Sequence, residues 1–75
     1  MKLKKLIPHI DSETKVYVVN KGHVLVCGHP EFIVSVNPTI FVHKDTNEEV
    51  HVLEAKVKKI SVRVPEYSLR LEVKF

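Results

Sequence analysis

The sequence predicts a mainly β protein: a small bent antiparallel sheet or open barrel of five to six strands with a short N-terminal helix. The chain has fourteen Val and five Ile against six Leu and one Ala, and branched side chains lose rotamer freedom in a helix but pack well on a pleated surface. Turn residues also interrupt the apolar runs at regular intervals. A length of 75 residues predicts a single domain, 1–75.

The N-terminus carries the spacing of a helix. Leu3, Leu6, Ile7 and Ile10 lie at i, i+3, i+4 and i+7, which places them on one helical stripe. Pro8 would break the turn that carries Ile10, because proline lacks the amide hydrogen. The pattern predicts one to two helical turns before Pro8 that cap either the open end or one face of the sheet.

A hairpin is predicted next. Residues 15–19 and 23–27 are two β-rich runs joined by Asn20-Lys21-Gly22, where Gly22 can take a positive φ at no steric cost. Pro30 has no amide hydrogen for a strand ladder and restrains the residue before it. The second strand is therefore expected to end at residues 28–30.

The middle of the chain predicts a second hairpin, formed by residues 32–36 and 40–43 around the turn residues 37–39. A polar loop is expected over residues 44–49. Residues 50–64 read as a strand, with a short helix from Asp45 through Leu53 as the open alternative.

Two further features concern the closing strands. The apolar alternation changes phase near Lys58-Lys59, which predicts a β-bulge there that returns the apolar side chains to one face. The residues before the change are Leu53, Ala55 and Val57, and those after it are Ile60, Val62 and Val64. After a turn at residues 65–67, the last strand is expected to direct Leu69, Leu71, Val73 and Phe75 inward and Ser68, Arg70, Glu72 and Lys74 to water.

Enzymatic chemistry is not expected. A domain this small leaves little room for a deep cavity, and the chain has two glycines, too few for a glycine-rich phosphate loop. The alternative is a zinc site formed by His23, Cys27 and His29, completed by His43 or His51. Because that spacing is not a familiar zinc motif, surface histidines are the expectation, with no metal and no cofactor.

The charge distribution suggests two binding surfaces. Net charge is +3 over residues 1–27, −4 over 28–54 and +4 over 55–75. The closing strands predict a basic strip that fits nucleic acid, formed by Lys56, Lys58, Lys59, Arg63, Arg70 and Lys74. The acidic middle predicts a surface that docks on a basic protein or mimics nucleic acid, formed by Phe41, Glu48, Glu49 and Glu54.

The opening Met-Lys-Leu-x-x-Leu-Ile, followed by Ile10-Asp11 and Thr14-Lys15-Val16, resembles a common type of short phage or prophage protein. The closing strands are also similar, whereas residues 32–53 depart from that pattern. The resemblance implies a small non-enzymatic protein that binds a host protein, with anti-CRISPR and other anti-defence inhibitors among the roles of such proteins. Nucleic-acid binding through the basic strip is the alternative function.

Cellular location and assembly complete the expectations. A lone cysteine, no signal-peptide core and no apolar run of membrane length predict a cytoplasmic protein, in the host bacterium if the gene is of phage origin, with no membrane partner. Residues 16–19 and 24–26 are apolar on both strand faces. This pattern requires a second covering layer, which either the N-terminal helix or the second copy of a homodimer would supply.

Overall fold

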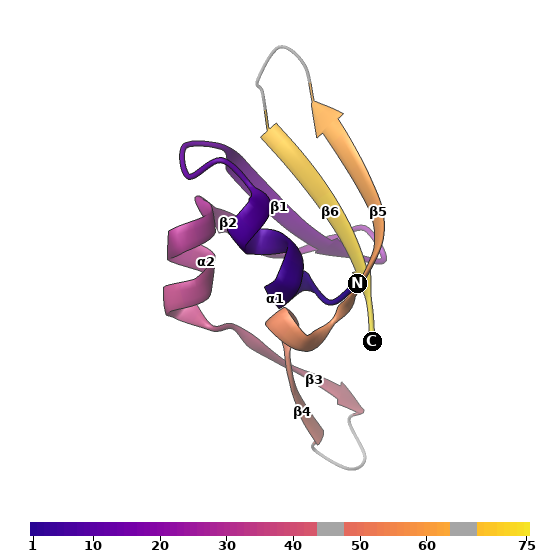
Figure 1. Cartoon of the computed structure of the whole chain (residues 1–75). Coiled ribbons are helices and arrows are strands. Elements are labelled where there is room, and N and C mark those ends of the chain that lie inside the picture. The colour runs from indigo at the N-terminus through magenta and orange to yellow at the C-terminus, as the bar shows by residue number, and fades with distance from the viewer. Residues whose placement is uncertain (44–47, 64–67) are drawn as a thin grey trace.

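The computed structural model describes residues 1–43, 48–63 and 68–75, with side chains described except at 41–43 and 48. It confirms a mainly β domain with a short N-terminal helix (Figure 1). The strands are β1 (Lys15–Asn20), β2 (His23–Gly28), β3 (Thr39–His43), β4 (Glu48–His51), β5 (Lys56–Arg63) and β6 (Ser68–Lys74). The helices are α1 (Leu3–Leu6) and α2 (Pro30–Val36), with the 3₁₀ turns η1 (Ile7–His9) and η2 (Val52–Glu54).

Four strands form a mixed sheet in the order β2-β1-β6-β5. The β1–β2 and β5–β6 pairs are antiparallel, as expected, but β1 and β6 run parallel, with Val18 opposite Leu71. An all-antiparallel sheet was therefore the wrong expectation. The side-chain amide of Asn20 donates a 2.9 Å hydrogen bond to the Val73 carbonyl oxygen, which continues the β1–β6 contact at the end of β1.

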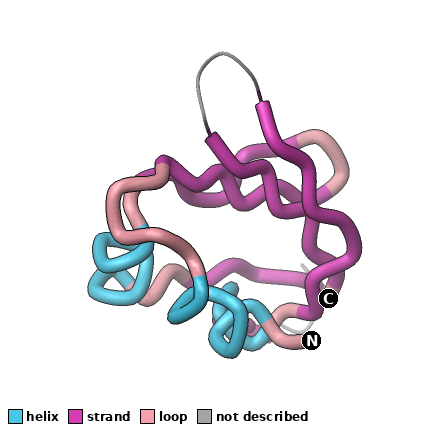
Figure 2. The backbone as a smooth tube through the Cα atoms, turned by 45° about the horizontal axis from the view of Figure 1, so that its top comes forward, coloured by secondary structure: helices cyan, strands magenta, loops and turns pink. Residues whose placement is uncertain are grey.

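The helices lie on one face of this sheet (Figure 2), and we call the opposite face the outer face. The core forms between the two layers and consists of Leu3, Ile7, Val16, Val18, Ile33, Val52, Ala55, Leu71 and Val73. The predicted helical stripe is confirmed, since Leu3 and Ile7 are buried and Leu6 and Ile10 pack against the core. The α-helix ends before Pro8, as expected. A 3₁₀ turn that contains Pro8 follows it and ends at His9.

Residues 30–36 form a helix, so the hairpin predicted from residues 32–36 is wrong. Pro30 is at a first-turn position of α2, where its missing amide hydrogen costs nothing. Asn37 ends the helix in the left-handed conformation, and its N–H donates to the Ile33 carbonyl oxygen at 3.1 Å. Pro30 and Ile33, one turn apart, are both buried. Capping and burial therefore outweigh the β propensity of the segment.

The first hairpin and the bulge are confirmed. Lys21 and Gly22 form the β1–β2 turn with φ of 50° and 82°, which suits a two-residue turn with positive φ at both positions. Val57 pairs with Val73 and Lys59 with Glu72, so Lys58 is the extra residue of the bulge. Ile60 and Val62 consequently pair with Leu71 and Leu69 on the helical side.

Several smaller expectations are corrected. Residues 48–51 form β4, paired with β3, and a 3₁₀ turn follows them in place of a continuous strand or a longer helix. Ser68 is buried although it was expected to face water, and Phe75 is 44% exposed although it was expected inside. The turn predicted at residues 65–67 and most of the polar loop over 44–49 lie outside the described residues.

The covering layer that the apolar β1 residues require comes from the chain itself. Val16, Val18 and Val19 are buried, while Leu25 and Val26 pack partly against the core. Val24 stays 57% exposed. The homodimer stays a prediction. Across the described residues, no helix is long and apolar enough to cross a membrane.

Candidate nucleic-acid interface

The outer face of the sheet gathers most of the predicted basic strip. Strand pairing places Arg70 opposite Ser61, Lys74 opposite Lys56, and Glu72 opposite Lys59. Since alternate residues of a strand share a face, these side chains line one surface. We define the basic face as Lys15, Lys56, Lys59, Arg63, Arg70 and Lys74. Glu72 is the one acidic side chain among the described residues of the same face.

Tyr17 supplies an aromatic ring beside these cations. It lies on β1 directly opposite Arg70 of β6, at the strand spacing of about 4.8 Å. The Lys15 ammonium lies 5.3 Å from the centroid of the Tyr17 ring, within range of a cation–π interaction. Sequence reasoning missed both residues, because only the parallel β1–β6 pairing joins them to the closing strands.

Two shallow hollows follow this face. One, of about 230 Å³, is lined by Tyr17, Val19, Gly22, Val24, Arg63 and Arg70. The other, of about 270 Å³, is lined by Lys59, Ser61, Arg63, Arg70 and Glu72. Arg63 and Arg70 line both hollows. The two hollows therefore adjoin at these side chains, and we call the pair of hollows the track.

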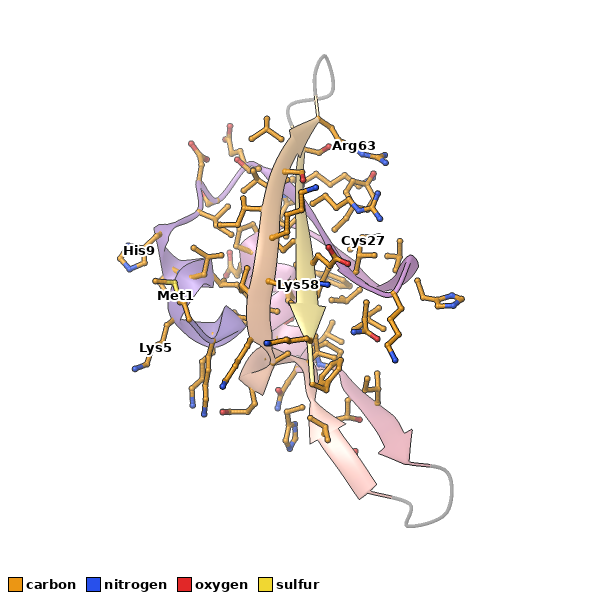
Figure 3. The ribbon with its side chains drawn as sticks, turned by 90° about the vertical axis from the view of Figure 1, so that its right-hand side faces the viewer. Met1, Lys5, His9, Cys27, Lys58 and Arg63 are labelled. Atoms are coloured by element: carbon orange, nitrogen blue, oxygen red, sulfur yellow. The ribbon has the colours of Figure 1, made fainter. Side chains whose placement is uncertain are left out.

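Lys58 is the extra residue of the β5 bulge, so strand alternation does not assign it to this face. Together with Lys59 it lines a hollow beside Met1 and Leu6. Figure 3 shows the division from the side: Arg63 and Cys27 extend from the outer face, Met1, Lys5 and His9 lie on the helical side, and Lys58 lies at the β5 edge between them.

The predicted acidic surface is not brought together in the same way. Phe41 and Glu49 are opposite each other on β3 and β4, in the two-stranded hairpin that projects from the four-stranded sheet (Figure 1). Glu49 is exposed, and the side chains of Phe41 and Glu48 lie outside the described ones.

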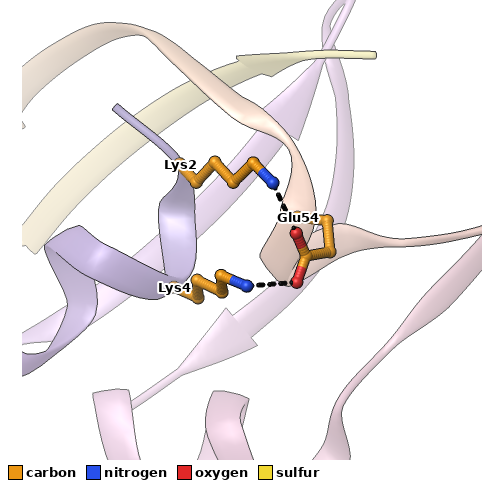
Figure 4. A network of polar contacts seen from close by, with 3 residues as sticks. All are labelled: Lys2, Lys4 and Glu54. Atoms are coloured by element: carbon orange, nitrogen blue, oxygen red, sulfur yellow. Dashed lines mark hydrogen bonds and ion pairs between the residues drawn. The ribbon is translucent and has the colours of Figure 1, made fainter.

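Glu54 is already engaged inside the domain. Its carboxylate accepts hydrogen bonds from the Lys4 ammonium at 2.6 Å and the Lys2 ammonium at 2.9 Å (Figure 4). These hydrogen bonds, first that of Lys4 and then that of Lys2, lower the pKa of Glu54 to about 2. The carboxylate therefore joins η2 to the N-terminal segment, and its charge is largely offset for any basic partner.

The histidines and Cys27 do not converge. The register of β2 shifts at Leu25, so Cys27 is opposite Tyr17 on the outer face while His23 is opposite Asn20. The shift places His23 and Cys27 on different faces, because alternation reverses at a bulge. Within the described part of the chain, no three His, Cys, Asp or Glu side chains gather as metal ligands would.

Comparisons with known proteins add no assignment to this geometry. No family model, no curated protein and no solved structure matches the chain.

Proposed function

We propose that this protein binds single-stranded nucleic acid on its basic face. The observation that carries the proposal is the pairing of Tyr17 with Arg70 in the middle of a surface with six basic side chains and one acidic side chain. Lys and Arg neutralise phosphates, and an aromatic ring stacks on any base. The open, shallow track suits a flexible strand better than an enzyme substrate, which needs a deeper pocket.

Salt-dependent binding tests the electrostatic part. Fluorescence anisotropy of labelled oligo-dT and oligo-rU dodecamers, measured across a salt series, is expected to give a log–log slope that approaches about −4 if all six basic side chains meet phosphates, at about −0.7 per contact. Lys59→Gln and Arg63→Gln should each reduce the slope by about 0.7. Lys5→Gln removes the same charge on the helical side (Figure 3) and is the control that leaves the slope unchanged.

Tyr17 variants test the stacking part. Tyr17→Leu should weaken binding by about 1–3 kcal/mol without changing the salt slope, and Tyr17→Phe should retain binding, because stacking needs the ring and not the hydroxyl. Equal affinities of Tyr17→Leu and wild type would remove the ring from the interface.

Cys27 provides an independent readout, because it is exposed, is the lone cysteine, and lies opposite Tyr17. Saturating oligonucleotide is expected to slow its alkylation by a maleimide. Unchanged alkylation at saturation would place the nucleic acid elsewhere on the protein.

A second candidate function is protein binding, including the anti-defence inhibition that the phage-type resemblance implies. Its support is apolar surface on the helical side: Met1, Ile60 and Val62 are 72%, 53% and 64% exposed. Large exposed apolar side chains that lie together are typical of protein interfaces. Capture of a bacterial protein by the tagged chain, retained after nuclease and high salt, would support this function.

A further inference from the structure

β5 is an edge strand of the four-stranded sheet. At its start the N-terminal segment covers the edge: the Val57 N–H donates to the Met1 carbonyl oxygen at 2.9 Å, and the Leu3 N–H donates to the Ala55 carbonyl oxygen at 2.8 Å. From the bulge onward, over residues 58–63, no described strand pairs with this side of β5. An open edge presents backbone donors and acceptors that another strand can pair with.

Apolar side chains and hollows lie beneath this open edge. Ile60 and Val62 continue the core rows of Leu71 and Leu69, but they stay 53% and 64% exposed. A hollow of about 390 Å³ lies beside Ile60, and it is lined by Met1, Leu6, Val57, Lys58, Lys59 and Ile60. A second, of about 270 Å³, lies beside Val62, and it is lined by Ile10, Asp11, Thr14, Val62, Ser68 and Leu69.

The charge of the strand selects what can pair with it. β5 reads KVKKISVR, with four basic residues and no acidic residue. A second copy of β5 would bring like charges together across the pair, which is destabilising. An incoming strand with acidic side chains on the outer side would instead meet Lys59 and Arg63, and its apolar side chains would extend over the two hollows.

We propose that residues 58–63 of β5 bind an extended peptide segment in which Val, Ile or Leu alternates with Glu or Asp, by addition of a strand to the sheet. Backbone hydrogen bonds supply affinity in this mode, and the alternate side chains supply specificity. The proposal rests on the second candidate function and names its partner chemistry. The peptide site shares Lys59 and Arg63 with the basic face but does not include Tyr17.

Designed peptides test the proposal with the full chain. A labelled octapeptide of alternating Val and Glu is expected to bind in an anisotropy assay. Three matched peptides should each bind at least tenfold more weakly: one with Lys in place of Glu, one with the same residues in two blocks, and one N-methylated at the amides of one edge. Equal binding of the N-methylated peptide would overturn the proposal, because strand addition needs those amides.

Variants locate the site. Val62→Lys should weaken peptide binding at least tenfold, since an inward-pointing charge blocks strand addition, and Val62→Thr, which keeps the branched shape, should weaken it less. Val36→Lys, at a 47% exposed apolar residue of α2, is the control with unchanged affinity. Peptide binding should also protect alternate amides of residues 58–63 from hydrogen exchange. Protection confined to other residues would contradict the proposal.

The outcomes separate the basic face from the β5 edge. Tyr17→Leu should weaken oligonucleotide binding and leave peptide binding unchanged. A bacterial protein that is still captured by Val62→Lys would leave protein binding standing and remove the β5 edge from it. Sedimentation equilibrium that shows a dimer disrupted by Val62→Lys, without peptide binding, would assign the edge to a second copy and overturn the peptide proposal.

Discussion

The Lys4 ammonium lies 2.6 Å from Oε1 of Glu54, fifty residues away in the chain, and Lys2 holds the other carboxylate oxygen at 2.9 Å. The contact between Lys4 and Glu54 joins α1 to η2, the turn before β5. Both lysines and the glutamate are partly exposed, so salt screens this contact.

The Glu54 contact predicts that the Glu54 carboxylate is protonated only at low pH. The pKa of Glu54 is lowered from 4.5 to about 2 in the folded protein. The ionised carboxylate with its two lysines therefore stabilises the fold fully above pH 4.5, and this stabilisation is lost as the pH falls through about 2. An NMR titration of the Glu54 carboxyl carbon should show this midpoint. Lys4→Ala should raise it more than Lys2→Ala, because the Lys4 hydrogen bond is the larger cause. A midpoint near 4.5 in wild type would contradict the contact.

Gly28→Ala should destabilise the fold. Gly28 has φ of 147°, a region that side chains rarely adopt, and an added Cβ would lie 2.6 Å from Cδ1 of Phe32. The expected loss is about 1–3 kcal/mol, measured by urea unfolding. In a Phe32→Ala background most of the loss should remain, because the exposed ring can move whereas the backbone strain cannot. A loss that vanishes in that background would assign the effect to the ring.

Asn37 predicts a contrast between two small substitutions. Its φ of 46° and ψ of 61° end α2 in the left-handed conformation. Asn37→Ala should cost about 1 kcal/mol, since a Cβ penalises this conformation, and Asn37→Gly should be neutral within about 0.5 kcal/mol. Thermal unfolding of the two variants checks the difference. Equal stabilities would show that the cap contributes little.

Two changes at Lys58 test the bulge. Deletion of Lys58 removes the bulge and leaves Val57, Ile60 and Val62 at every second position, so each remaining side chain keeps its present face of the sheet. We expect the deletion variant to retain cooperative unfolding, measured by circular dichroism during urea denaturation. Lys58→Ala keeps the bulge and should change stability by less than about 0.5 kcal/mol. Loss of cooperative unfolding in the deletion variant would mean that the fold requires the bend that the bulge gives to β5.

Local patterns predicted the elements whose chemistry is local. The Lys21-Gly22 turn, the helical stripe from Leu3 and the bulge at Lys58 each depend on residues close in sequence. Residues 32–36 were predicted as a strand because of their β-branched side chains. They form a helix because Pro30 and Asn37 cap its two ends and Ile33 is buried. A proline that opens the segment and an asparagine that closes it were the available signals for a helix.

The basic strip was predictable from composition, but its relation to Tyr17 was not. Charge and alternation place Lys59, Arg63 and Arg70 on the closing strands. Only the parallel pairing of β1 with β6 places Tyr17 beside Arg70. The bulge at Leu25, which separates His23 from Cys27, likewise follows from how β2 meets β1.

The sequence by itself determined the β class, the first hairpin, the N-terminal helix and the bulge of β5, because turn geometry, side-chain branching and strand alternation act between near neighbours. The tertiary structure alone decided the mixed strand order, the engagement of Glu54 by Lys2 and Lys4, and the open edge of β5 above Ile60 and Val62. Contacts between residues some fifty positions apart depend on how the whole core packs, and no local pattern encodes that packing.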